Sequence, residues 1–276
     1  MSRLRAPSAD GGVLCVPEWN TWPDLVAANR KLQASWQVEI LGRSLTDLRQ
    51  QARREMLMAA IRYSSQYRAV PQIDVHAVSE HPLVLGGHQP ELFHPGVWLK
   101  NFALDAFAQR VGGVAVNLVI DADAFKTCEL PVPTHNGNCV TRSMVAFDEP
   151  AAPSVYETRR IVDRECFESF GQRVIAALQP LVPQPLIREA WPHVVERAKT
   201  TGLIGAAFAQ SRHQREAAWG LETLELPQSV VCTQAVFYEF VTHLVVHRER
   251  FRDIYNQAIR DYRQVHHLRS ASQPAP

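Results

Sequence analysis

The segment from Leu83 to Ile120 constrains the fold more than any other part of this 276-residue chain. Leu83–Leu85 is a short apolar run of the kind that forms a buried strand, and Val97–Val111 follows with the apolar spacing of a helix. Val114–Ile120 is then almost continuously apolar, as expected for a strand that is covered on both faces. Strand, loop, helix and strand in this order predict a right-handed βαβ unit with parallel strands.

The fold class that follows is α/β, with a small Rossmann-like parallel sheet and a large helical content. A third, weaker strand is indicated at Leu221–Leu226, whereas a doubly wound sheet usually has about five or six strands. We therefore expect a small sheet within a single domain over residues 13–268, with helical additions. A flexible tail at 1–12 and a disordered tail at 269–276 would flank that domain.

Helix signals fill much of the remaining chain. Ser44 precedes an amphipathic stretch that reaches about Tyr67, and its spacing to Asp47 is close to a capping box. Thr21, followed by Pro23, marks another helix start. Further helices are expected over Arg164–Leu178 and about 186–199, 203–218 and 233–265, and weaker strands at Val13–Pro17, Val140–Phe147 and Ser154–Ile161.

Composition restricts the partners of the protein. The chain has 29 basic and 28 acidic residues, and this balance argues against a nucleic-acid or anionic membrane partner. Its apolar runs are far shorter than the ~20 residues of a membrane span, and the polar N-terminus lacks a signal core. The five cysteines form no C-x-x-C pair, which favours reduced thiols. These features predict a cytoplasmic globular protein and by themselves give no function. A small-molecule substrate is expected from the loop motifs described below, and a homo-oligomer is left open.

The loop after the first strand is the strongest functional signal. Glycines after a strand let backbone N–H groups approach a ligand, and the next helix presents its positive N-terminus to an anion. The loop is neither a Walker motif nor a G-x-G-x-x-G fingerprint. The candidate cofactor-binding residues are Gly86, Gly87, Gln89, Gly96 and Lys100.

Two histidines of this loop are candidate catalytic residues. His88 and His94 could donate hydrogen bonds to a phosphate as charge develops on it, and Lys100 could neutralise the same anion. The alternative is structural: both histidines would cap the helix and satisfy loop backbone groups.

Asp121 and Asp123 follow the second strand, on an extended segment in which alternate side chains would point the same way. Both are candidate catalytic residues and candidate Mg²⁺ ligands, because two carboxylates in one crevice can hold Mg²⁺, act as a base or bind ribose hydroxyls. The alternative is a strand end that needs polar turn formers. In open α/β sheets the ligand crevice lies at the carboxyl ends of the strands, where both polar clusters fall.

Two other groups of polar residues give weaker signals for a functional site. His243 and His247 share a helix face and are competent for metal binding, but the Glu of H-E-x-x-H is missing. Cys128 and Cys139 flank His135 without metal-type spacing, so structural cysteines are favoured.

The run Gly87-His88-Gln89-Pro90-Glu91-Leu92-Phe93, with Asp121-Ala122-Asp123 after the next strand, resembles the bacillithiol biosynthesis cysteine-adding enzymes. That family carries a comparable Gly-Gln-Gln-Pro/Ala-Gly-Leu-Phe loop and an Asp-His-Asp cluster. The resemblance covers about residues 83–125 and implies a Rossmann-like core with a nucleotide-sized pocket, in an enzyme that ligates cysteine to a glucosaminyl-malate. It carries over onto Gly87, Gln89, Leu92, Phe93, Asp121 and Asp123, whereas His88, Glu91 and Ala122 depart from it.

The leading hypothesis is therefore a ligase or group-transfer enzyme that binds a nucleotide, such as ATP or ADP with Mg²⁺, or another phosphorylated or acidic small molecule. One alternative is a nucleotidyltransferase-like enzyme, whose usual H-x-G-H spacing is missing here. Another is a non-catalytic remnant domain that binds a ligand through the same pocket.

Overall fold

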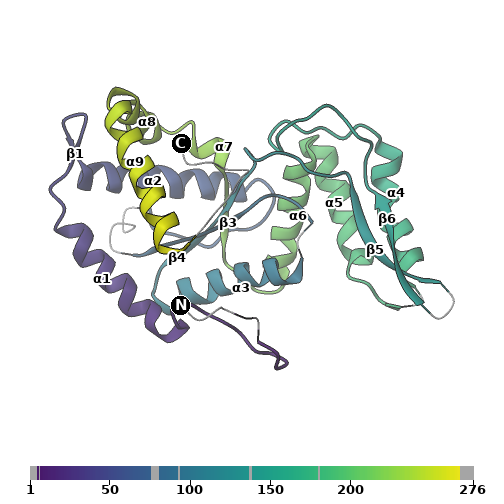
Figure 1. Ribbon diagram of the computed structural model, residues 1–276. Coiled ribbons are helices and arrows are strands. Elements are labelled where there is room, and N and C mark those ends of the chain that lie inside the picture. Colours follow the sequence, from purple (N-terminus) through teal and green to yellow (C-terminus); the bar gives the residue numbers. More distant parts are fainter. Residues whose placement is uncertain are drawn as a thin grey trace.

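A computed structural model describes residue 5 and residues 7–75, 81–92, 94–136, 139–179 and 181–267 (Figure 1). Its central sheet has three parallel strands in the order β3-β4-β7, and they comprise β3 (Leu83–His88), β4 (Val114–Val119) and β7 (Leu224–Pro227). Helix α3 (Pro95–Arg110) connects β3 to β4, which confirms the βαβ unit. The fold class is α/β with a small Rossmann-like sheet among many helices, as predicted.

Helices cover both faces of the sheet (Figure 1). On one face, Val116 of β4 packs in a core with Leu57 and Ala60 of helix α2 (Leu45–Ser64). On the other face, the adjacent Ala115 packs against Leu104 of α3. The alternation of side chains along a strand thus places α2 and α3 on opposite faces.

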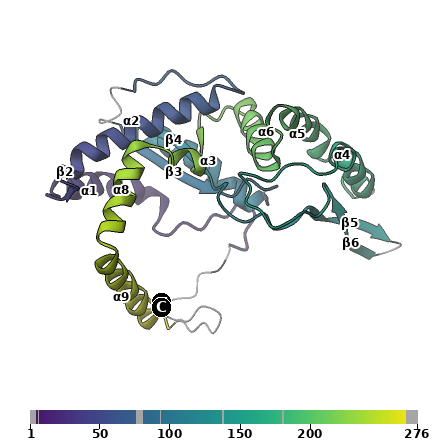
Figure 2. The same cartoon turned by 90° about the horizontal axis from the view of Figure 1, so that it is seen from above.

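A second, largely helical region lies beside the sheet (Figures 1 and 2). It contains the antiparallel hairpin β5 (Glu129–Asn136) and β6 (Cys139–Ala146), followed by helices α4 (Arg164–Leu178), α5 (Ile187–Thr201) and α6 (Ile204–Ala218). Its core is rich in aromatic side chains, which include Phe147, Phe167, Phe170, Trp191 and Phe208. Gly171 allows the close approach of α5, because a Cβ atom there would lie 2.7 Å from that of Trp191.

The remaining elements lie at the two ends of the chain. They are η1 (Trp19–Thr21), α1 (Trp22–Ala34), β1 (Glu39–Ile40), β2 (Arg43–Ser44), α7 (Gln228–Val231), α8 (Ala235–Val246) and α9 (Arg248–Val265). Helices α1, α8 and α9 contain no buried residue. Figure 2 shows α8 and α9 extending away from the sheet. In the part of the chain that the structure describes, no helix combines the length and apolar composition of a membrane span.

Several local predictions are confirmed and others are wrong. Ser44 caps α2 by accepting a hydrogen bond from the backbone N–H of Thr46 at 3.2 Å. The helix expected over 233–265 is instead two helices that meet at His247, whose φ of −106° departs from helical geometry. Val13–Pro17 forms no strand, and Ser154–Ile161 contributes only isolated bridges. The tail expected at 269–276 lies outside the described residues, as do residues 1–4 and 6.

Strand β5 was not expected, because Pro131 and Pro133 lower the strand propensity of its sequence. The two prolines occupy alternate positions, so their nitrogens face the same side of the strand. Since the described hairpin pairs β5 only with β6, that side is the unpaired edge, where proline costs no ladder hydrogen bond.

Candidate functional site

The two polar clusters predicted from the sequence meet at the carboxyl edge of the sheet. His88 is the last residue of β3, and its carbonyl oxygen accepts a hydrogen bond from the N–H of Ile120 at 2.9 Å. The side-chain Nε2 of Gln89 then donates to Oδ2 of Asp123 at 2.6 Å. The loop after β3 and the turn after β4 are therefore joined by a direct side-chain contact.

Asp123 is a partly exposed carboxylate that the surrounding groups keep ionised. Its pKa lies below the usual value because of the hydrogen bond from Gln89, a second from the N–H of Ala124 at 2.8 Å, and the positive charge of Lys126. An ionised carboxylate at this edge can accept hydrogen bonds from an amine or a hydroxyl group of a ligand.

His88 lies beside a carboxylate of its own loop. Its Nδ1 is 3.9 Å from Oε1 of Glu91 and 3.2 Å from the carbonyl oxygen of Gln89. A carbonyl oxygen can only accept, so in the neutral ring Nδ1 carries the hydrogen of that bond and the lone pair is on Nε2. The side chain of His88 is 22% exposed.

Tyr156 supports this arrangement from a third segment. Its hydroxyl donates to Oε2 of Glu91 at 3.3 Å, and its backbone N–H donates to the carbonyl oxygen of Asp123 at 3.1 Å. Burial and the charge of Glu91 raise the pKa of Tyr156, so the phenol stays protonated and acts as a donor. Gly205 at the start of α6 packs here, since a Cβ atom would lie 3.1 Å from that of Tyr156 and 3.0 Å from Cγ of Pro90.

Asp121 has a different environment from Asp123. Its two carboxylate oxygens accept hydrogen bonds from the backbone N–H and the hydroxyl of Ser229, just after β7. Residues 121–123 form a turn and not the extended segment that was expected. The two carboxylates therefore bind partners on opposite sides of β4. In the described residues no group of three or more His, Cys, Asp or Glu side chains is arranged to hold a metal ion.

His94 has the capping role that was the alternative for both histidines. Its Nδ1 accepts a hydrogen bond from the N–H of Gly96 at 3.1 Å at the start of α3. Lys100 is exposed on the same helix, and no described contact links it to His88 or Asp123. Phe93 lies outside the described residues.

Gly86 and Gly87 belong to β3 and not to the loop. A Cβ atom at Gly87 would lie 3.0 Å from the carbonyl oxygen of Leu118, and one at Gly86 would lie 3.3 Å from Cδ2 of Leu104. Close packing against β4 and α3 thus accounts for both glycines.

A buried polar network that was not predicted from the sequence lies between the sheet and α6. Glu225 of β7 is fully buried and pairs with Arg212 of α6. It also accepts a hydrogen bond from Nδ2 of Asn117 at 2.7 Å. Burial raises the pKa of Glu225, and Arg212 opposes that effect. An ion pair therefore holds α6 against the sheet.

Two more titratable groups of α6 complete the network. Oε1 of Glu216 accepts hydrogen bonds from Nε1 of Trp98 and Nδ2 of Asn101, both at 2.7 Å. Nδ1 of His213 lies 2.7 Å from the Tyr67 hydroxyl. His213 is fully buried, and desolvation lowers its pKa to about 3.

The sequence carries little signal for this network. Glu225 alternates with Leu224 and Leu226, a pattern that is typical of a strand with one exposed face. Arg212 and Glu216 are spaced i and i+4, which is equally typical of a solvated helix face.

The fold and the polar edge together define an α/β protein with a candidate small-molecule site at the carboxyl ends of its parallel strands. Neither a scan against protein-family models nor a search of curated proteins found a match to this chain.

Proposed function

We propose that the protein is a ligase or group-transfer enzyme that acts on a small molecule at the carboxyl edge of the sheet. The observation that carries the proposal is the hydrogen bond between Gln89 and Asp123, which places an ionised carboxylate next to the His88–Glu91 pair. This edge is also where ligands bind in open α/β sheets.

His88 would act as the general base. A substrate amine or hydroxyl would give its proton to Nε2 as it attacks an activated carbonyl or phosphoryl group. The carbonyl oxygen of Gln89 would orient the ring through Nδ1, and the charge of Glu91, which Tyr156 holds in place, would stabilise the imidazolium that forms. The proton would then pass to the leaving group.

Asp123 and Gln89 would bind the substrate. The carboxylate would accept hydrogen bonds from the attacking amine or hydroxyl, and Gln89 fixes its orientation. The second substrate would be a nucleotide or another phosphorylated or acidic molecule. The position of the site in a Rossmann-like sheet and the resemblance to cysteine-adding enzymes support this choice.

The test is a turnover assay with ATP, Mg²⁺ and a mixture of amino acids and amino sugars, followed by ³¹P NMR and mass spectrometry. We expect the wild type to form a ligated or phosphorylated product. His88→Asn should reduce the rate at least about 100-fold, since general base catalysis contributes ~10²–10⁴-fold. The matched control is His193→Asn, which changes an exposed histidine of α5 and should retain the wild-type rate.

Two outcomes would count against the proposal. If His88→Asn were as active as the wild type, the assigned base would be wrong. If the wild type bound a nucleotide without turning over any mixture, the non-catalytic binding domain would replace the enzyme.

A further inference from the structure

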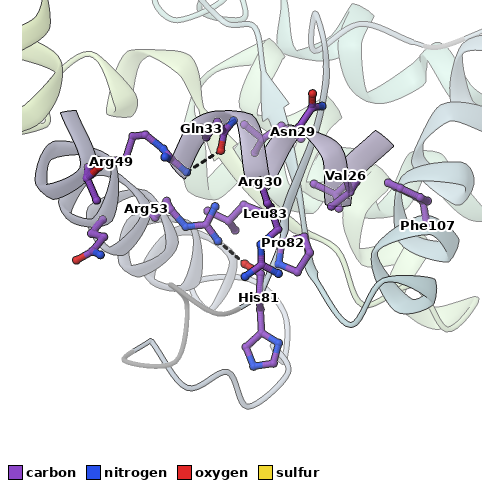
Figure 3. A pocket seen from close by; sticks show the side chains of 14 residues that line it. Val26, Asn29, Arg30, Gln33, Arg49, Arg53, His81, Pro82, Leu83 and Phe107 are labelled. Atoms are coloured by element: carbon purple, nitrogen blue, oxygen red, sulfur yellow. Dashed lines mark hydrogen bonds between the residues drawn. The ribbon is translucent and has the colours of Figure 1, made fainter. Parts of the chain in front are cut away.

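A cavity of about 370 Å³ lies at the opposite end of β3 from His88, between α1, α2 and the strand (Figure 3). Side chains of α1 and α2 and the chain segment from His81 to Leu85 line it. Its volume is within the range of small-molecule sites, ~300–1,000 Å³.

Three arginines line this cavity, and none of its described lining residues is acidic. Arg30 comes from α1, whereas Arg49 and Arg53 come from consecutive turns of α2 (Figure 3). The guanidiniums are close enough to affect one another. The pKa of Arg53 is lowered by burial and then by the positive charges of Arg49 and Arg30. An anion among the three would relieve this repulsion.

The arginines are oriented by their neighbours. Arg49 donates a hydrogen bond to Oε1 of Gln33 on α1 at 2.6 Å, and Arg53 donates to the carbonyl oxygen of His81. These contacts fix two of the three guanidinium groups at the cavity, so a ligand would meet donors that are already ordered.

Few side chains of helix α1 pack against the rest of the protein, chief among them Trp22, whose ring lies edge-on to Phe107 with the centroids 5.2 Å apart. The helix buries no residue, and Leu25 and Leu32 are 44% and 55% exposed. A ligand that binds Arg30 and Arg49 together would tie α1 to α2.

We propose that this cavity binds a compact small-molecule anion with at least two negative charges on phosphate or carboxylate oxygens, held by Arg30, Arg49 and Arg53. Guanidinium groups match both kinds of oxyanion with paired hydrogen bonds. This inference is independent of the proposed function, because the cavity and the His88 edge lie at opposite ends of β3.

The experiment is isothermal titration calorimetry of the full chain with pyrophosphate and, separately, with citrate at constant ionic strength. We expect saturable binding of at least one anion, and the tighter one identifies the oxyanion class. Arg30→Gln and Arg49→Gln should each weaken binding at least about tenfold, because each removes a charged hydrogen-bond donor from the anion. Arg53 is left intact because it also supports the His81 backbone.

The matched control is Arg250→Gln, an exposed arginine of α9, which should bind the anion as the wild type does. Hydrogen exchange adds a second readout: the bound anion should slow exchange of the α1 amides. Saturable binding of neither anion overturns the proposal, as does equal affinity in Arg30→Gln. Because Arg30 is exposed, misfolding is an unsatisfactory explanation for a loss of affinity in that variant.

Discussion

Two of the polar clusters among the described residues differ in exposure. The first, around His88, Gln89, Glu91 and Asp123, lies at the carboxyl edge of the sheet, where its side chains are partly exposed. The second, around Arg212, His213, Glu216 and Glu225, is buried between the sheet and α6. Buried charges must be satisfied by the protein itself, whereas partly exposed ones can still bind a ligand. We therefore assign stability to the buried cluster and chemistry to the edge.

The largest effect on the free energy of unfolding should come from breaking the buried ion pair between Arg212 and Glu225. Arg212→Met leaves Glu225 and Glu216 buried without their guanidinium, which should lower the free energy of unfolding by ~3–5 kcal/mol. Urea denaturation measures the change. In the matched control Arg215→Met, whose partner Glu189 is exposed, the cost should stay below about 1 kcal/mol. Equal losses in the two variants would remove the distinction between the clusters.

The buried histidine gives a pH signature. Its folded-state pKa of about 3 lies below the usual 6.5, so between these values the unfolded state binds a proton that the native state does not. The free energy of unfolding should fall as the pH drops from 6.5 toward 3, by at most ~1.4 kcal/mol per pH unit from this group. Glu225, whose pKa is raised, contributes in the opposite direction.

The comparison of the wild type with His213→Gln isolates that contribution, because Glu225 is present in both proteins. Between pH 7.5 and pH 5.0, urea denaturation should show that the wild type loses about 2 kcal/mol more than the variant. Parallel pH dependences would mean that His213 does not control acid stability.

Substitutions of Asp121 and Asp123 should have different effects, the first on stability and the second on ligand binding. Asp121→Ala removes the acceptors of both Ser229 hydrogen bonds and should lower the free energy of unfolding by ~1–2 kcal/mol. Asp123→Ala should destabilise the protein less and abolish ligand binding at the edge. Thermal unfolding together with a binding titration would detect a reversal of these roles.

The smallest effect is expected at His94. Asparagine is a good N-cap, so His94→Asn should change the free energy of unfolding by less than about 0.5 kcal/mol and leave turnover unchanged. A large loss of turnover with intact stability would give His94 the catalytic role that we assign to His88 alone.

Sequence patterns predicted the βαβ unit well, because the apolar run of β4 and the helical spacing of α3 are local signals. Contacts between segments that are far apart in the sequence leave no such local pattern, so they were not predictable. Tyr156 reaches Glu91 across 65 residues, and Ser229 reaches Asp121 across 108. The alternation rule failed at Asp121 and Asp123 because the chain turns there, and only the third strand explains why their partners differ.

The central claim is that the carboxyl edge of the sheet is the ligand site, and hydrogen exchange with and without saturating ADP and Mg²⁺ tests it most directly. We expect slower exchange in residues 88–92, 120–126 and 154–157, and no such protection in Asp123→Ala. Protection confined to residues 26–53 around the arginine cavity, or no protection at all, would contradict the claim.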